Sequence, residues 1–237
     1  MSVRLPVRIA LTLSAIQLLG VAMLFAAESA EGTAEYGVEK NVFYLEQPEA
    51  DATPQQRECC RLDVYYPRER PGFATFIWIH GGGLWGGNRE IAPYLTELSP
   101  LLRREGIALV SIGYRVTPQA KCPDYLEDAA AGVAWTFKNI ERFGGDPGKI
   151  ILTGGSAGAY LAAMIGLDKQ WLNKHEIDPD RLLGLVPLSG QMITHQTVRK
   201  EQGLAKLRPS IDRYAPLFHV RGDALAFLLI TGHRELE

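Results

Sequence analysis

The sequence predicts an α/β fold in which helices cover both faces of a mostly parallel sheet. Five apolar runs have the length of strands and are rich in aliphatic and β-branched residues, as in strands buried on both faces; they span 73–79, 107–112, 150–153, 183–188 and 225–231. Helical patterns separate these runs, and buried strands that alternate with helices form parallel sheets. With 237 residues the chain is long enough for one sizeable core.

The composition is that of an ordinary globular protein. Apolar residues make up 46% and charged residues 22% of the chain, and the formal net charge is −2. No long run of one charge sign is present, so binding to nucleic acid driven by counterion release is excluded. The cysteine and histidine spacings resemble no zinc site, so we expect no metal.

Residues 1–27 have the pattern of an export signal. Arg4 and Arg8 precede the apolar stretch Ile9–Ala27, and Gly20–Ala22 fits the small-x-small rule for cleavage. The alternative is an uncleaved N-terminal anchor, because about 20 apolar residues can span a bilayer. We expect an exported protein, periplasmic or secreted, with no stable membrane partner unless this segment stays uncleaved.

A single α/β domain is expected from residue 61 to residue 237. Residues 28–60 are polar and mixed, and we treat them as a separate N-terminal segment. Leu62–Tyr66 alternates and ends at Pro67, which is typical of an edge strand. In an oxidising compartment one cysteine of the vicinal pair Cys59-Cys60 could bridge to Cys122, and the sequence leaves this open.

The clearest helix is predicted over Asp124–Phe143. Asp124 and Glu127 resemble a capping box at its start, and Gly144-Gly145 ends it. A 3.6-residue apolar stripe runs along it, formed by Leu126, Ala129, Ala130, Val133, Ala134, Phe137 and Ile140.

The pattern G-x-S-x-G at Gly154–Gly158 lies between the strand at 150–153 and an apolar helix. At such a junction the pattern is a nucleophile elbow, in which a strained turn pushes the serine oxygen clear of the backbone. Neighbouring side chains would collide there, and the helix N-terminus favours negative charge. A plain turn of the same composition is the alternative. The context predicts that Ser156 is a catalytic nucleophile.

A second glycine cluster, Gly81–Gly83, directly follows the strand at 73–79. Successive glycines let backbone N–H groups approach a substrate, and such a loop forms an oxyanion hole together with the amide after the nucleophile, here that of Ala157. The alternative is a phosphate cradle, but the spacings of the known phosphate-binding loops are missing. We expect the preceding His80 to anchor the loop and not to act as a base.

The acid is expected after the strand at 225–231, in the order serine, acid, histidine. Glu235 is the candidate, with Glu237 behind it; Asp223 precedes the strand and is disfavoured. The alternative role for Glu235 is a solvated loop carboxylate.

No histidine has the expected place of a base. His175, His195 and His219 lie in connections or before the last strand, where surface or packing roles are common. His233 shares the loop of the acid, and we do not expect it to reach Ser156.

Taken together, the motifs resemble those of the bacterial α/β-hydrolase esterases over residues 61–237. The nearest branch is similar to hormone-sensitive lipase, acetylesterases and the feruloyl-esterase-like (BD-FAE) group. The motifs are His80–Gly87, Gly113-Tyr114-Arg115, Glu127–Ala130, Gly145-Asp146-Pro147 with Lys149-Ile150, and Gly154–Gly158.

This resemblance implies an α/β-hydrolase fold with Ser156 as nucleophile. It implies an oxyanion hole made by the amides of Gly82, Gly83 and Ala157, and structural roles for Tyr114, Arg115 and Asp128. The family usually has aspartate where Glu235 stands, and it continues with a helix, a last strand and a loop that carries the catalytic histidine. We therefore expect the sequence to lack that last strand and helix and to be C-terminally incomplete.

The implied reaction is acyl transfer to water through an acyl-enzyme, without cofactor or metal. By analogy alone, the substrate is a small-molecule or carbohydrate ester with a short acyl or feruloyl group. Two alternatives stay open. One is an amidase or formamidase with the same apparatus, and the other is a non-catalytic remnant that lacks the histidine.

Overall fold

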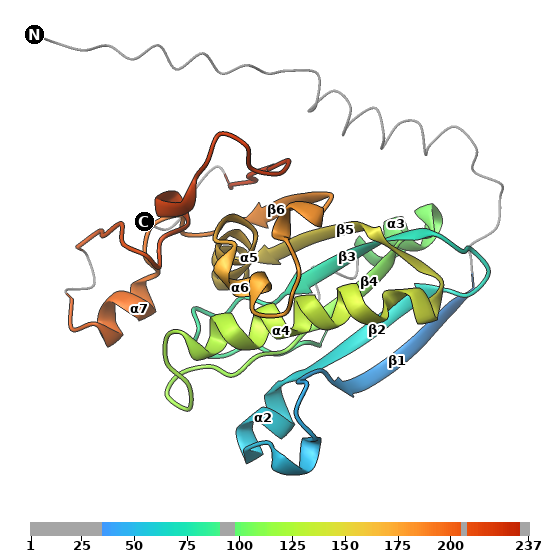
Figure 1. Cartoon of the computed structure of the whole chain (residues 1–237), viewed down its shortest axis with the longest axis horizontal. Helices are drawn as coiled ribbons and strands as arrows, with labels where there is room; N and C mark the ends of the chain where they lie inside the picture. Colours follow the sequence, from blue (N-terminus) through green and yellow to red (C-terminus); the bar gives the residue numbers. More distant parts are fainter. Residues whose placement is uncertain (1–34, 91–97, 205–207, 233–237) are drawn as a thin grey trace, which may run out of the picture. The chain divides into compact units, whose positions relative to one another are not determined.

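The chain forms a six-stranded sheet in the order β1-β2-β4-β3-β5-β6 (Figure 1). The computed structural model describes residues 35–90, 98–204 and 208–232. The pairs β4–β3, β3–β5 and β5–β6 are parallel, whereas β1 and β2 run antiparallel to their neighbours. The strands are β1 Tyr36–Phe43, β2 Arg61–Pro67, β3 Phe73–Ile79, β4 Ala108–Ile112, β5 Gly145–Gly155 and β6 Gly184–Leu188.

Helices cover both faces of the sheet, as predicted. Ile77 and Ile79 of β3 belong to the main core with the buried sides of α4 and α5. Trp78, on the opposite face of the same strand, packs with Leu102 of α3 and Leu109 of β4, so α3 lies behind the sheet in Figure 1. The α-helices are α2 Pro54–Cys59, α3 Leu98–Glu105, α4 Asp124–Asn139, α5 Ala157–Leu167, α6 Gln170–Asn173 and α7 Gln196–Glu201.

The edge of the sheet differs from the prediction. The expectation that 62–66 forms an edge strand is wrong, because β2 lies between β1 and β4. β1 pairs with β2 from Tyr36, and the register shifts between Glu39 and Val42. This irregularity and the exposed polar side chains break the period-2 pattern that marks a strand in a sequence. The sheet thus begins upstream of residue 61, the expected start of the domain.

The helix predicted at 124–143 is present as α4 followed by a 3-10 turn, Ile140–Phe143. Gly144 ends the turn with φ 92°, as expected of a left-handed cap. The predicted capping box is wrong, since Pro123 is the N-cap residue and no side chain caps the helix. The carboxylate of Asp124 instead accepts from the backbone N–H of Lys121 at 3.1 Å.

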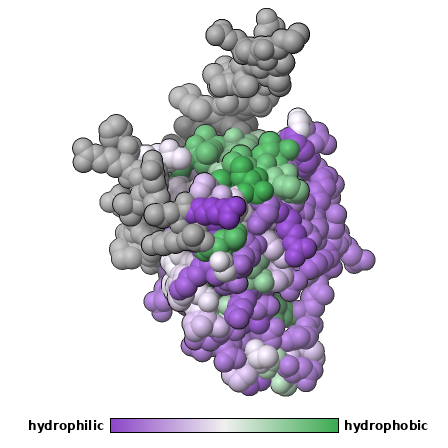
Figure 2. Space-filling model, turned by 90° about the vertical axis from the view of Figure 1, so that its left-hand side faces the viewer, coloured by the Kyte–Doolittle hydropathy of each residue, from purple (hydrophilic) through white to green (hydrophobic). Residues whose placement is uncertain are grey.

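The run at 225–231, which was predicted to be a strand, lies beside β6. It pairs with β6 only at two isolated bridges, Leu185 to Phe227 and Leu188 to Ile230. The backbone N–H of Ile230 donates to the carbonyl of Pro187 at 3.1 Å. The side chains from Phe227 to Ile230 are exposed, among them Leu228 at 54%. Figure 2 shows a patch of apolar residues on one face of the molecule. An exposed apolar sheet edge has unpaired backbone groups and can pair with another strand.

A buried ion pair joins the β4–α4 connection to helix α4. Nε and NH2 of Arg115 donate to the carboxylate of Asp128 at 2.7 and 2.8 Å, and the backbone N–H of Arg115 donates to it at 3.1 Å. The side chain of Asp128 is only 3% exposed. These are the residues for which the family resemblance implied structural roles.

The remaining expectations concern thiols and membrane contact. Cys59, Cys60 and Cys122 are free, so the bridge that the sequence left open is not formed. The export signal at 1–27 lies outside the described residues. Within residues 35–90, 98–204 and 208–232, no helix combines the length and apolar character needed to cross a membrane.

We predict that Asp128→Ala lowers the free energy of unfolding by about 1.5–3 kcal/mol, because it removes the charged hydrogen-bond acceptor of the half-buried Arg115 guanidinium. Glu127, the neighbour of Asp128 on α4, forms an exposed ion pair with Lys174, and Glu127→Ala should cost about 1 kcal/mol or less. Urea unfolding of both variants measures the difference. Equal losses would contradict the anchoring role of Asp128.

Candidate active site

Ser156 lies at the turn between the end of β5 and the start of α5, with φ 52° and ψ −113°. Positive φ is unfavourable for a residue with a β-carbon, so the surrounding structure must hold it. The N–H of Ser156 donates to the carbonyl of Leu188 at 2.8 Å, and its carbonyl accepts from Tyr160 N at 3.1 Å. The turn leaves Ser156 exposed at the carboxyl edge of the parallel strands.

Glycines allow the backbone of this turn to lie directly against the end of β3. A β-carbon on Gly158 would lie 2.0 Å from the carbonyl oxygen of Ile79, and one on Gly154 would lie 2.5 Å from the carbonyl carbon of Gly158. A β-carbon on Gly81 would lie 2.8 Å from the oxygen of Gly155 and 3.4 Å from Cβ of Ser156. The absence of side chains therefore brings the two glycine clusters into contact.

The glycine loop, residues 80–87, carries N–H groups that have no acceptor among the described residues. Gly82 and Gly83 have φ values of 110° and 65°, and the carbonyl of Gly82 accepts from Trp85 N at 2.9 Å. The N–H groups of Gly82, Gly83 and Ala157 donate to no other residue that the structure describes. Free amides beside an exposed serine can hold a developing oxyanion. Ala157 also opens helix α5, whose N-terminal end favours negative charge.

His80 anchors the glycine loop, as the sequence analysis expected. Its ring stacks on Tyr114 with centroids 4.2 Å apart, and its Nδ1 lies 2.8 Å from the carbonyl oxygen of Gly81. The hydroxyl of Tyr114 donates to the carbonyl of His80 at 2.8 Å. Burial lowers the pKa of His80 to about 4, so the ring is neutral near pH 7.

The other described histidines lie elsewhere. Nδ1 of His175 is 3.6 Å from Glu46, and Nε2 of His219 is 3.5 Å from Asp168. His195 is buried, and its Nδ1 accepts from Thr197 N at 3.2 Å. Burial lowers the pKa of His195 to about 4, with a smaller contribution from Arg199. No described histidine forms a hydrogen bond with Ser156.

The candidate acid is not among the described residues. Glu235, Glu237 and His233 all lie in the stretch 233–237, outside the described part of the chain. Asp223, which the sequence disfavoured, has a largely exposed carboxylate 3.2 Å from NH1 of Arg221. The described structure thus brings together the predicted nucleophile and oxyanion donors only.

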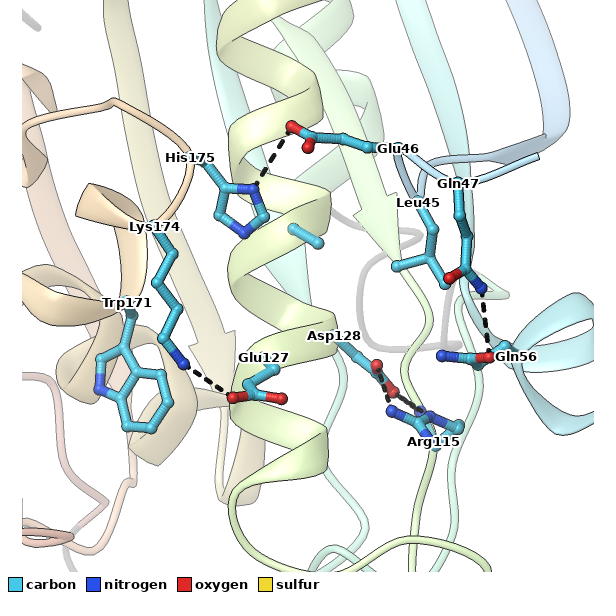
Figure 3. A pocket seen from close by; sticks show the side chains of 11 residues that line it. Leu45, Glu46, Gln47, Gln56, Arg115, Glu127, Asp128, Trp171, Lys174 and His175 are labelled. Atoms are coloured by element: carbon cyan, nitrogen blue, oxygen red, sulfur yellow. Dashed lines mark hydrogen bonds and ion pairs between the residues drawn. The ribbon is translucent and has the colours of Figure 1, made fainter. Parts of the chain in front are cut away.

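A cleft of about 360 Å³ lies between α4, α6 and the segment after β1 (Figure 3). Its polar groups contact one another: Lys174 pairs with Glu127 at 2.8 Å, and Nδ1 of His175 lies 3.6 Å from the carboxylate of Glu46. Neither Ser156 nor the glycine loop lines it. We interpret it as a solvated groove without free groups for catalysis. The lining residues are Leu45, Glu46, Gln47, Gln56, Arg115, Glu127, Asp128, Ala131, Trp171, Lys174 and His175.

One residue beside the glycine loop was not found by sequence reasoning. Oγ1 of Thr197 donates to the carbonyl of Gly83 at 2.6 Å, although the two residues are 114 positions apart. No local pattern marks this threonine, because only the path of the chain brings it to the loop.

We predict that Gly158→Ala lowers the free energy of unfolding by about 3 kcal/mol or more, since the new methyl group would overlap the oxygen of Ile79. Gly86→Ala is the matched control, because a β-carbon there meets nothing within 4 Å. It should change stability by about 0.5 kcal/mol or less. Urea unfolding tests both, and a tolerated Gly158→Ala would contradict the close backbone contact.

We predict that stability falls as the pH drops from 6.5 to about 4. The pKa values of buried His80 and His195 are about 4 in the folded state and 6.5 when unperturbed, so between these values only the unfolded chain binds the protons. Each histidine should contribute a loss on the order of 3 kcal/mol, complete below pH 4. Urea unfolding across this range measures the slope. His195→Asn should remove about half of the loss that the two histidines cause together, and an unchanged slope would contradict the neutral buried state of His195.

The chain is similar to a known protein family and to several curated proteins. The BD-FAE family model matches residues 62–216, more than half of the chain. The "Probable isoprenylcysteine alpha-carbonyl methylesterase" of Oryza sativa subsp. japonica is 37% identical over 127 residues, which cover 52% of this chain and 26% of that protein. The "Probable carboxylic ester hydrolase LipM" of Mycobacterium tuberculosis is 28% identical over 185 residues, covering 69% of this chain and 42% of that protein. The chain therefore spans less than half the length of these curated relatives.

A solved structure described as a truncated form of a carbohydrate esterase from gut microbiota is similar with a TM-score of 0.66 and 20% identity. The match covers 85% of this chain and 78% of that one. At this identity the likeness concerns the fold, and with the strand order it confirms the α/β-hydrolase fold. The resemblance to esterases is confirmed as well: the chain belongs to the BD-FAE family, with carboxylic ester hydrolases among its relatives.

Proposed function

We propose that the protein hydrolyses carboxylic esters through an acyl-enzyme on Ser156. The observation that carries this proposal is the exposed serine with φ 52°, held beside three N–H groups that have no acceptor in the described part of the chain. A strained serine and free amides in the adjoining loop and helix start together favour acyl transfer over a simple turn, because a turn needs neither.

In the proposed reaction, Oγ of Ser156 attacks the ester carbonyl carbon while its proton passes to a base. The carbonyl oxygen becomes an oxyanion, which the N–H groups of Gly82, Gly83 and Ala157 bind. Collapse of the tetrahedral intermediate releases the alcohol and leaves an acyl-serine, which water hydrolyses by the same steps. Each oxyanion donor is worth about 3 kcal/mol of transition-state stabilisation.

Proton transfer is assigned to a histidine outside the described residues, oriented by Glu235. The described histidines support this assignment indirectly. His80 and His195 are buried with lowered pKa values, and His175 and His219 lie beside other carboxylates. A base must lie within hydrogen-bond reach of the proton that it removes, so none of these four has the required place.

The proposed substrate is a small ester, with a short acyl group or a carbohydrate alcohol, and the reaction needs no cofactor or metal. Two similar proteins support this substrate class: the solved structure of a carbohydrate esterase and the probable carboxylic ester hydrolase of Mycobacterium tuberculosis. We also propose export to the periplasm or medium, on the pattern of residues 1–27.

We predict that a fluorophosphonate probe forms one covalent adduct, at Ser156, at neutral pH. Ser156→Ala should abolish labelling. Ser189→Ala is the matched control, because Ser189 also has a positive φ, 55°, at the end of a parallel strand, and it should label like the wild type. Intact-mass and peptide mass spectrometry read the adduct. Labelling that persists in Ser156→Ala would refute the proposed nucleophile, and a wild type that does not label would refute the proposed esterase activity of this chain.

A further inference from the structure

We propose that Thr197 is a positioning residue that holds the glycine loop in the orientation needed for oxyanion binding. This inference rests on the proposed function. Oγ1 of Thr197 donates to the carbonyl oxygen of Gly83 at 2.6 Å and accepts from Nε1 of Trp85 at 3.0 Å. A hydroxyl has one proton to donate, and this proton goes to the loop.

The glycine loop needs an external support because side-chain packing does not hold Gly83. A β-carbon on Gly83 would meet only the Trp85 ring, at 3.7 Å. The φ of Gly83 is 65°, and glycine can move between positive and negative φ at little cost. Leu84, the next residue, is buried in the main core and anchors the loop there, whereas the peptide groups on either side of Gly83 take their orientation from hydrogen bonds.

Thr197 acts on the peptide group next to a proposed oxyanion donor. The N–H of Gly83 shares a peptide plane with the carbonyl of Gly82, which accepts from Trp85 N at 2.9 Å and Gly86 N at 3.2 Å. The carbonyl of Gly83 belongs to the following plane, and there Thr197 is the described donor. When both planes are held, φ and ψ of Gly83 are set, and so is the direction of its N–H.

Thr197 is itself held firmly. Thr197 lies in the first turn of α7 and is only 2% exposed. Its backbone N–H donates to Nδ1 of His195 at 3.2 Å, which requires a neutral ring with its proton on Nε2. Burial lowers the pKa of His195 to about 4 and so keeps this acceptor available near pH 7. The link thus runs from His195 through Thr197 to the loop.

The same hydroxyl also orients Trp85, whose ring is 50% exposed on the loop. Nζ of Lys200, on the same helix as Thr197, lies 4.3 Å from the centre of this ring. Helix α7 therefore contacts the loop at a backbone carbonyl, an indole N–H and an aromatic face.

The test compares Thr197→Val, which keeps the shape and loses the hydroxyl, with Thr197→Ser, which keeps the hydroxyl. Thr136→Val is the matched control, since buried Thr136 donates to the carbonyl of Gly132 at 3.0 Å within α4. We expect Thr197→Val to lower kcat for an activated ester by about 10- to 100-fold with KM changed by about 2-fold or less. Thr197→Ser and Thr136→Val should retain kcat within about 3-fold.

Hydrogen exchange gives a readout that does not depend on turnover. The amides of Trp85 and Gly86, which donate to the carbonyl of Gly82, should exchange about 10-fold faster in Thr197→Val than in the wild type, and at the wild-type rate in the other two variants. Unchanged exchange in Thr197→Val, or equal loss of kcat in Thr197→Val and Thr136→Val, would overturn the positioning role. Failure of the wild type to label at Ser156 would instead overturn the proposed function, so the two failures are distinguishable.

Discussion

The site depends on one contact: the backbone of the turn around Ser156 lies directly against the backbone at the end of β3. Gly154 and Gly158 leave no room for a β-carbon beside Ile79, and Gly81 leaves none beside Gly155. Any side chain at these places would separate the serine from the glycine loop by the width of a methyl group or more. Because interiors are packed as densely as crystals, that separation could not be absorbed elsewhere.

Two different kinds of support hold the two halves of the site. The strained serine, which costs about 1–3 kcal/mol, is held by rigid elements, since β5 lies between β3 and β6 and every residue of α5 is buried. Within the glycine loop, Leu84 is buried in the core, but no side chain holds the glycines themselves. The loop is held at its start by His80 on Tyr114 and in its middle by Thr197 on Gly83. The serine is thus set by the sheet, and the amides by a few polar side chains.

Several elements could be predicted closely, and the failures have physical reasons. The strand Phe73–Ile79 has the predicted bounds, because continuous burial on both faces leaves a plain apolar run. β1 was missed because it is exposed and interrupted between Glu39 and Val42. The carboxylates of Asp124 and Glu127 took local and long-range partners in place of the cap. A short-range pattern cannot report such competition among polar groups.

Local sequence was enough to place Ser156 between a strand and a helix and to mark both glycine clusters, because torsional freedom and the periodicity of burial are properties of neighbouring residues. Tertiary structure alone decided that β1 takes the sheet edge, that Asp128 pairs with Arg115, that His80 and His195 are buried and neutral, and that Thr197 reaches Gly83. These contacts join residues far apart in the chain, and their energies depend on burial and on paired groups that no single segment contains.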